Sequence, residues 1–224
     1  MHSMHTMYTA VIIEPRKHKA LSFVLKNVLD NLPNEWNILI FHGTDNQEFV
    51  KQLPEFSHRR ILPPICLDIK NLSMSQYNLI LKSSAFYKCI PTDLFLIFQT
   101  DTMILTPELL PTFLEYDYIG APWVNGMVGN GGFSLRRKSK MIEICQSVPS
   151  FTENEDNYFS YQHTVYLSKP SFEIARTFSI ETVFHEKPFA IHSPWKYLNH
   201  YEMTYLLHTY PAIQTLIDLQ AVES

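Results

Sequence analysis

A single carboxylate interrupts a strongly apolar stretch near the middle of the 224-residue chain. In "FQTDTMIL" the apolar run Leu94–Phe98 ends in Gln99, Thr100 and Asp101, and apolar residues then resume. An aspartate after a strand often begins a turn. It can also be a hard oxygen ligand for Mg²⁺ or Mn²⁺ that bridges to a diphosphate. The stretch alone favours the turn, so the decision depends on the rest of the chain.

Glycine is concentrated in one segment. Four of the six glycines lie between Gly126 and Gly132, in and just before "GNGGFSLRRKSK" (Gly129–Lys140). Glycine lets the backbone approach a bound molecule closely, so we expect a ligand-contacting loop here, with a flexible turn as the alternative. The segment matches neither GxGxxG nor a Walker sequence. GxGxxG is also missing after the first predicted strand, which argues against a dinucleotide-dependent oxidoreductase. The basic run "RRKSK" (Arg136–Lys140) is expected to start a helix and to face water.

Two further segments carry groups that could act on a ligand. "TENEDNYFS" (Thr152–Ser160) places Glu153, Glu155 and Asp156 among aromatic residues, where one carboxylate could serve as a general base. The alternative is a solvated acidic loop. "KPFAIHSPWKY" contains His192, which is either a hydrogen-bonded core residue or a metal ligand.

Two tryptophans offer flat faces to sugar rings. Trp123 lies in "GAPW" and Trp195 in "HSPW". Either can equally be a core residue, because tryptophan is usually well buried.

The elements that must position these residues alternate between strand and helix. We predict strands in "YTAVIIE" (Tyr8–Glu14), "WNILIFHG" (Trp36–Gly43), "RILPPICLDI", "LFLIFQTDTMIL" and "YDYIGAPW". Helices are predicted where apolar residues share one face: Leu21, Val24, Leu25 and Val28; Tyr77, Ile80, Leu81 and Ala85; and also in "QEFVKQL" and near 138–146. After Pro107 we expect a short or irregular helix, because Pro111 would disturb it after one turn. This alternation indicates one α/β domain with a mostly parallel sheet. Ligands bind at the carboxyl ends of such strands, which is where Glu14, Arg16 and Asp101 fall.

Composition narrows the class of protein. A hydrophobic fraction of 46%, a charged fraction of 18% and a net charge of −4 fit a globular domain without a nucleic-acid partner. Cys66, Cys89 and Cys145 lie in apolar segments without CxxC spacing, so we expect reduced, buried thiols and a reducing compartment. The N-terminus does not resemble a signal peptide, and no window is apolar enough for a membrane span. A cytoplasmic or otherwise soluble protein is expected.

The order of the landmarks is more specific than any one of them. "FQTDT", "VGNGGFSLR", "NEDNYFS" and "FAIHSPW" follow one another as do the landmarks of nucleotide-sugar glycosyltransferases of the GT-A fold. The chain most resembles a family still described as a domain of unknown function, with "FQTDT…YIGAPW…GNGGFSLR" at its centre. The resemblance runs from "VIIEPR" to "HSPWKY" and implies a GT-A-like, Rossmann-type sheet flanked by helices. It divides the single domain into a nucleotide-binding half (8–118), an acceptor and catalytic half (119–200) and a C-terminal helical tail (201–224).

The resemblance also assigns roles to residues. Asp101 matches the metal-binding end of the DxD motif, Asp156 matches the acid that removes the acceptor proton, and His192 matches the histidine that completes the metal shell. The donor site would further include Gln99, which stands where DxD has its first carboxylate, together with Thr100, Glu14 and Arg16. The acceptor side and glycine loop would include Trp123, Asn130, Gly131, Gly132 and Trp195.

The activity implied by the resemblance is transfer of a sugar from a nucleoside-diphosphate sugar to a glycan or other hydroxyl acceptor. A UDP-sugar is favoured, with a GDP-sugar as the alternative, and Mn²⁺ or Mg²⁺ would be the cofactor. An inverting transfer is favoured. Without a metal, Arg16, Lys196 or the basic residues at 136–140 would neutralise the diphosphate instead. A relative that binds nucleotide or carbohydrate without catalysis remains the other hypothesis, because Gln99 replaces a carboxylate.

Overall fold

The computed structural model describes residues 7–150 and 153–220. The N-terminal end of the sequence, Thr152 of the acidic segment and the last four residues of the predicted tail lie outside the described residues. The strands are β1 (Tyr8–Ile13), β2 (Trp36–His42), β3 (Ile65–Cys66), β4 (Leu94–Ile97), β5 (Thr102–Ile104), β6 (Tyr118–Gly120), β7 (Ser134–Arg137), β8 (Ser179–Ile180) and β9 (Ala190–His192). The α-helices are α1 (Leu21–Asn31), α2 (Gln47–Lys51), α3 (Met74–Leu81), α4 (Ser84–Lys88), α5 (Lys138–Ser147), α6 (Glu155–Tyr161), α7 (Phe172–Phe178), α8 (His200–Thr209) and α9 (Ala212–Gln220). The 3₁₀ turns are η1 (Pro54–Ser57), η2 (Pro107–Phe113) and η3 (Pro194–Lys196).

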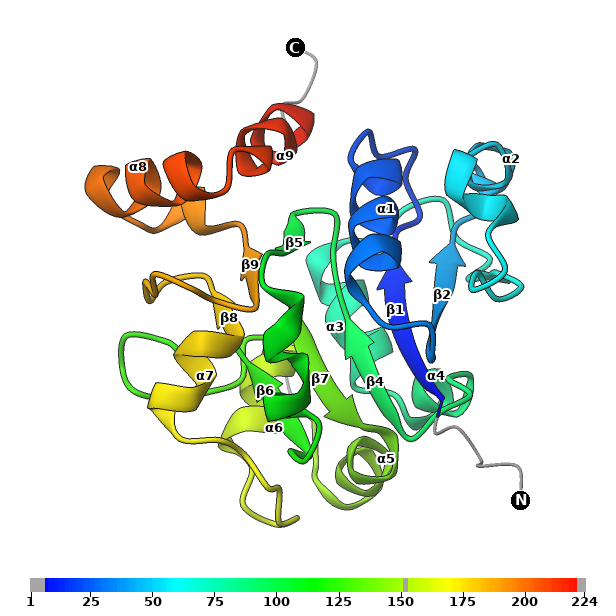
Figure 1. The fold of residues 1–224 in the computed structure, drawn as a ribbon. Coiled ribbons are helices and arrows are strands. Elements are labelled where there is room, and N and C mark those ends of the chain that lie inside the picture. Colours follow the sequence, from blue (N-terminus) through cyan, green and yellow to red (C-terminus); the bar gives the residue numbers. More distant parts are fainter. Residues whose placement is uncertain (1–6, 151–152, 221–224) are drawn as a thin grey trace, which may run out of the picture.

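The central sheet has the strand order β3-β2-β1-β4-β7-β6 (Figure 1). The β3-β2, β2-β1 and β1-β4 pairs are parallel, whereas β4-β7 and β7-β6 are antiparallel. A smaller sheet has the order β5-β9-β8. The α/β class predicted from the alternation of strands and helices is therefore confirmed.

Both faces of the central sheet are covered, which explains the nearly continuous apolar runs of β1 and β2. Alternate residues of β1 point to opposite faces: Ala10 and Ile12 join the core under α1, and Val11 and Ile13 join the core under α4, α5 and α6. The four residues predicted for the helical face near position 24 are all buried in α1. These two cores fix the edge of the sheet from which the carboxyl ends of β1 and β4 emerge.

The predicted strand over 94–105 is wrong in one respect, because it is two strands in two sheets. β4 pairs with β1 and β7 in the central sheet, and β5 pairs with β9 in the smaller one. Gln99, Thr100 and Asp101 form the link between them. The carboxylate interrupts the apolar run because the chain leaves one sheet there and enters another.

Several local predictions need correction. The face predicted across Tyr77 to Ala85 belongs to two helices, since α3 ends at Leu81 and Ser83 caps α4 with its side chain. Arg136 does not face water: it lies in β7 and is 0% exposed. Cys66 and Cys89 are exposed and Cys145 is half-buried, so the thiols are free but not buried. The irregular segment predicted at Pro111 is confirmed as the 3₁₀ turn η2.

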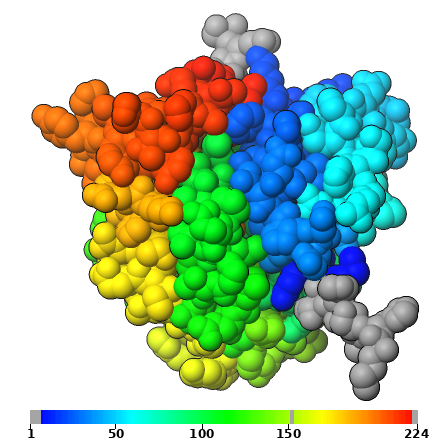
Figure 2. All heavy atoms as spheres, viewed as in Figure 1, coloured from blue at the N-terminus to red at the C-terminus, as the bar shows by residue number. Residues whose placement is uncertain are grey.

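The C-terminal helices α8 and α9 close one end of the molecule. Figure 2 shows this orange and red segment against the blue N-terminal third of the chain. Leu206 of α8 and Ile213 and Leu216 of α9 are buried in the core that also contains α1. Within the described ranges, every helix is too short or too polar to cross a membrane.

Candidate functional site

A pocket of about 460 Å³ opens at the carboxyl ends of β1 and β4. Its walls come from the loop after β1, the start of α3, the link between the two sheets, η3 and the end of α9. The lining residues are Ile13, Glu14, Pro15, Arg16, His18, Asn71, Leu72, Ser73, Met74, Tyr77, Gln99, Thr100, Asp101, Lys196 and Gln220. The pocket thus brings together the five residues predicted for donor binding: Glu14, Arg16, Gln99, Thr100 and Asp101. Donor binding itself stays a prediction.

Glu14 and Arg16 form one rigid unit at the rim of this pocket. The Arg16 side chain donates from Nε and Nη2 to the two Glu14 carboxylate oxygens at 2.8 and 2.7 Å. Asn46 donates to the backbone carbonyls of both residues and so fixes the loop. Glu14 is buried, whereas the Arg16 side chain is 54% exposed. The guanidinium therefore presents its remaining N–H groups to the pocket from a held position.

Asp101 meets His192 because of strand register. In the β5-β9 pair Thr102 lies opposite His192, and the Ser193 N–H donates to the Asp101 carbonyl at 2.9 Å. The carboxylate then has His192 Nε2 at 3.5 Å and Lys196 Nζ at 3.1 Å. Burial alone would raise the pKa of Asp101, but the hydrogen bonds and positive charges of these two partners outweigh it and hold the pKa well below its usual value. Asp101 is thus a strongly ionised carboxylate facing the pocket.

His192 is held on its other side by residues of two further elements. Its Nδ1 lies 3.2 Å from Oε1 of Glu181 and 2.9 Å from Oδ1 of Asn130. Glu181 was missed by the sequence analysis. It directly follows β8, which pairs in parallel with β9 so that Ile180 lies opposite Ile191. Burial lowers the pKa of His192, but the hydrogen bonds to Asp101 and Glu181 raise it more, to about 9.

Gly132 supports the ring of His192 by close approach. A Cβ added to Gly132 would lie 2.2 to 2.7 Å from three ring atoms of the histidine. Gly131 is equally tight, because its added Cβ would lie 1.8 Å from Glu155 Oε1. This glycine loop therefore lies directly between His192 and the acidic helix α6.

Gly132→Ala is expected to destabilise the protein by about 1–3 kcal/mol, because the ring of His192 cannot move without breaking its own hydrogen bonds. Urea unfolding measures this. Gly126→Asn is the control: nothing lies within 4 Å of a Cβ added there, so its cost comes from the positive φ of 87° alone and should stay below about 1 kcal/mol for asparagine. Unchanged stability of Gly132→Ala would show that the ring is not held in this way.

The two acids of the "ED" pair have different surroundings. Glu155 is buried and receives two hydrogen bonds from Arg136, at 2.8 and 3.0 Å. Asp156 is half-buried and accepts only from the next backbone N–H among its recorded partners. Burial, helped by the negative charges of Glu155 and Glu181, raises the pKa of Asp156 to about 6. Asp156 does not line the pocket, but its carboxylate is electrostatically coupled to Glu181 and so to the His192 cluster.

The tryptophans differ as well. Trp123 is half-buried and lies nearly parallel to Tyr161 of α6, with ring centroids 6.4 Å apart and 6° between the ring planes. Asn125 of the same loop donates to the Tyr161 hydroxyl at 3.3 Å. Trp195 is also half-buried and packs against the core that contains α1. Trp123 therefore lies beside the acidic helix, and Trp195 beside the pocket.

Two hydrogen bonds made by pocket residues carried no signal in the sequence. The Gln99 side chain donates to the Tyr77 hydroxyl at 2.9 Å and so ties the link between the two sheets to α3. Gln220 donates to the Thr100 carbonyl at 2.8 Å across 120 residues. Contacts at that sequence separation have no local pattern from which they could be inferred.

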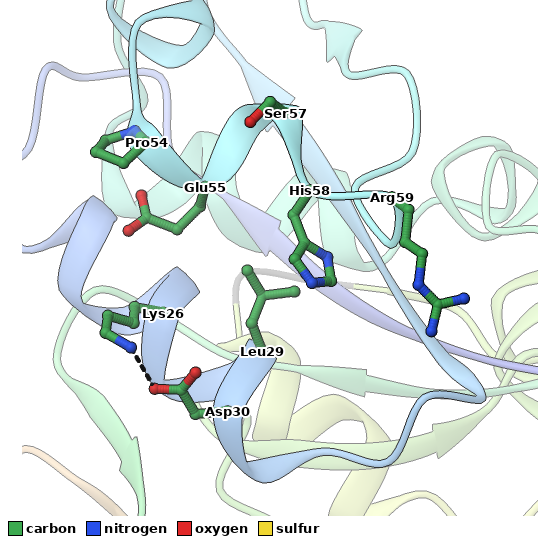
Figure 3. Close-up of a pocket in the computed structure, with 8 residues that line it drawn as sticks. All are labelled: Lys26, Leu29, Asp30, Pro54, Glu55, Ser57, His58 and Arg59. Carbon is green, nitrogen blue, oxygen red and sulfur yellow. Dashed lines mark hydrogen bonds and ion pairs between the residues drawn. The ribbon is translucent and has the colours of Figure 1, made fainter.

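A second hollow of about 610 Å³ lies between α1 and η1 (Figure 3). It is lined by Lys26, Leu29, Asp30, Pro54, Glu55, Ser57, His58 and Arg59, and Lys26 pairs with Asp30 at 2.6 Å. None of the site residues predicted from the sequence lines it. The candidate site is therefore the pocket at the carboxyl ends of the strands.

The fold of this chain, with the polar pocket at the carboxyl ends of its strands, is a GT-A-like fold, as comparison with solved structures shows. The GlyE glycosyltransferase of Streptococcus pneumoniae TIGR4 is 13% identical, with a TM-score of 0.57 over 95% of this chain and 62% of that chain. The galactosyltransferase LgtC, solved with donor and acceptor sugar analogues, is 12% identical, with a TM-score of 0.54 over 97% of this chain and 98% of that chain. WbbM, a bifunctional glycosyltransferase, is 10% identical, with a TM-score of 0.56 over 98% of this chain and 53% of that chain. At these identities the likeness establishes the fold alone.

Within that class, residues 65–192 match the family described as protein of unknown function DUF5672, and the chain belongs to this family. The matched range contains "FQTDT", the glycine loop, the acidic helix and His192. No functionally curated protein matches the sequence. The chain spans 62% of the length of GlyE, so similarity to that protein covers only part of it.

Proposed function

We propose that this protein is a glycosyltransferase that moves a sugar from a nucleoside-diphosphate sugar to a hydroxyl group of an acceptor, with inversion at the anomeric carbon. The observation that carries the proposal is that Asp101, held by His192 and Lys196, lines the same pocket as Lys196 and Arg16. The arrangement suits a diphosphate, because a fixed guanidinium and an ammonium group face the same cavity. The glycosyltransferase fold supports the assignment without establishing it.

The residues of the chain divide the chemistry between them. Arg16 and Lys196 would bind the diphosphate and offset the negative charge that develops as it leaves. Asp156, with a pKa of about 6, would take the proton of the acceptor hydroxyl as that oxygen attacks the anomeric carbon. Trp123, which stacks on Tyr161 of the same helix α6, would support the acceptor. In this scheme the chain divides as the resemblance implies, into a nucleotide-binding half (8–118), an acceptor half (119–200) and a helical tail from 201.

A divalent cation fits the site only with help from the substrate. Asp101 and His192 offer one carboxylate and one imidazole, and within the described ranges no three His, Cys, Asp or Glu side chains converge on a point. Asp101 and His192 would hold Mn²⁺ or Mg²⁺ together with oxygens of the diphosphate. A cation bound there would supply Lewis-acid stabilisation of the leaving diphosphate.

Asp101→Asn is expected to lower the release of nucleoside diphosphate from an activated sugar at least 100-fold, because it removes the carboxylate to which His192 and Lys196 are directed. The assay is a panel of UDP- and GDP-sugars with and without Mn²⁺, preceded by a thermal-shift screen that identifies the donor. Asp30→Asn, an exposed aspartate of α1 that does not line this pocket, is the control. Full activity of Asp101→Asn would remove Asp101 from this role.

The second candidate, a binding protein without catalysis, is favoured by one observation. Gln99 stands at the first DxD position and its amide is used on Tyr77 rather than offered to a ligand. Calorimetric binding of a nucleotide sugar, with no turnover over the complete donor panel, would favour this candidate over the transferase.

A further inference from the structure

The surroundings of the His192 ring determine where its proton lies. Nδ1 faces Oδ1 of Asn130 at 2.9 Å and Oε1 of Glu181 at 3.2 Å, and Nε2 faces Asp101 at 3.5 Å. Glu181 is 6% exposed, and its second oxygen accepts from Asn130 Nδ2 at 2.9 Å. The ring, the amide and the carboxylate thus form a closed, buried triangle.

The orientation of the Asn130 amide is fixed by a backbone group. The Gly132 N–H donates to Asn130 Oδ1 at 3.1 Å, and a backbone N–H can only donate. A flipped amide would set two donors against each other at Gly132 and two acceptors against each other at Glu181. Oδ1 must therefore face His192. Both groups at Nδ1 are acceptors, at 2.9 and 3.2 Å, whereas Nε2 has the single, more distant acceptor Asp101 at 3.5 Å. The neutral ring therefore keeps its one proton on Nδ1, and Nε2 carries a proton only when the ring is charged.

We propose that Glu181 is a positioning residue that, with Asn130, fixes the proton of His192 on Nδ1 and so leaves Nε2 as the ring atom presented to Asp101 and to any cation held there. The glycine loop completes this arrangement, because Gly132 lies against the ring and keeps it from turning. A histidine that binds a metal commonly donates its other N–H to a carboxylate, which fixes the tautomer and raises the basicity of the ligating nitrogen. Only the consequence for cation binding rests on the proposed function; the tautomer does not.

The tautomer is measurable in the free protein. Long-range ¹H–¹⁵N correlation spectra of protein labelled with ¹⁵N-histidine, recorded at a pH where the ring is neutral, distinguish a protonated from an unprotonated ring nitrogen. His192→Gln identifies the signals. We expect the proton of neutral His192 on Nδ1. A proton on Nε2 in the wild-type protein would overturn the proposal, whatever any variant does.

Glu181→Gln tests the role of the carboxylate. The amide has one acceptor oxygen in place of two, so it cannot accept from both His192 and Asn130. We expect the Nε2–H tautomer to gain population and the affinity for Mn²⁺ in the presence of saturating UDP, followed by electron paramagnetic resonance, to fall 10–100-fold. Glu173→Gln, on the exposed face of the preceding helix, is the matched control and should change neither. Circular dichroism verifies folding.

The outcomes separate the two proposals. Unchanged tautomer and unchanged Mn²⁺ affinity in folded Glu181→Gln would overturn the positioning role even if the protein transfers sugar. If the wild-type tautomer is as expected and Glu181→Gln shifts it, but neither protein binds Mn²⁺, the positioning role stands and the metal-dependent form of the proposed function fails.

Discussion

Replacing Asp156 by asparagine is expected to abolish sugar transfer and, at neutral pH, to make the protein more stable. An acceptor hydroxyl needs a base aligned with it, and positioned proton transfer contributes about 10²–10⁴-fold to the rate. The amide cannot accept that proton. The variant is nearly isosteric, and among residues 7–150 and 153–220 Asp156 has no ion pair that it would break, so the loss should appear in kcat rather than in donor affinity. Steady-state kinetics with the donor found by the screen measures both.

The gain in stability follows from the raised pKa. Folding raises the pKa of Asp156 from its ordinary value of 3.8 to about 6, mainly by burial. Between these values the folded state binds more protons than the unfolded state, so stability falls as pH rises through this window, and the cost is fully present above pH 6. Asparagine never becomes charged and removes that cost. Thermal unfolding at pH 4 and pH 7.5 should therefore show a difference between the two proteins that is larger at pH 7.5.

The same pKa predicts the pH profile of the proposed sugar transfer by the wild-type protein. The base must be ionised, so kcat should fall about tenfold per unit below pH 6 and should be level above it with respect to this group. Asp30→Asn, at an exposed position on α1, is the matched control and should leave activity and its pH profile unchanged. Normal transfer by Asp156→Asn would exclude Asp156 as the base.

The strands that could be predicted from the sequence are those covered on both faces of the sheet. β1 and β2 are almost wholly apolar because both faces of the central sheet are covered, and such runs have few other interpretations. The prediction over 94–105 failed for the same reason: β4 and β5 are both largely buried, so their apolar residues resemble one continuous strand. A run of apolar residues indicates that a segment is buried, but it does not indicate to which sheet the segment belongs.

The candidate site could be predicted only in part, because its residues come from positions far apart in the sequence. Asp101, placed at the carboxyl end of a predicted strand, could be expected at the ligand-binding edge of the sheet. Its partners could not be derived from local patterns, since Lys196 lies 95 residues away and reaches it through the β5-β9 register. Glu181 owes its place to the parallel pairing of the two-residue strand β8, which is too short to predict.

Arg136 shows the opposite error, in which a local pattern points the wrong way. The run "RRKSK" has the composition of a solvated helix start, yet its first residue is the most deeply buried charge of the region. The run straddles a boundary: β7 ends at Arg137, and α5 begins at Lys138. Arg136 can be buried because it pairs with Glu155, which lies 19 residues later in the chain. The residues around the basic run therefore give no sign of this partner.

Glu155→Gln is expected to destabilise the protein by about 3–5 kcal/mol, because it leaves the Arg136 guanidinium buried without its counter-charge. Arg136 is 0% exposed, and its remaining hydrogen bonds are to neutral oxygens: the Ser134 hydroxyl at 2.8 Å, the Gly131 carbonyl at 3.2 Å and the Tyr87 hydroxyl at 3.4 Å. The faces of Tyr118 and Phe159 lie 5.2 and 5.6 Å from the guanidinium carbon, and they offset only part of the lost charge. Urea unfolding at pH 7 measures the change.

Glu143→Gln is the matched control, since it makes the same substitution in an exposed ion pair with Lys140 and should cost less than about 0.5 kcal/mol. In the double variant Glu155→Gln/Arg136→Met the buried charge is gone, so the total loss should be smaller than the sum of the two single losses. Additive losses would mean that the two side chains stabilise the fold separately and not as a pair.

The pair should also matter for activity at temperatures where the variant is still folded. Glu155 and Asp156 are neighbours in the first turn of α6, and the bond from Arg136 ties that turn to β7 and to the glycine loop through the Gly131 carbonyl. Releasing it frees the carboxylate of Asp156 to move relative to the pocket, and loss of about 1 Å of alignment can cost about 100-fold in rate. If the protein transfers sugar as proposed, Glu155→Gln should therefore lower kcat well below what its folded fraction explains, while donor affinity, assigned in the proposal to Arg16 and Asp101, stays near the wild-type value. A fall in kcat that matches the folded fraction would confine the Arg136–Glu155 pair to stability alone.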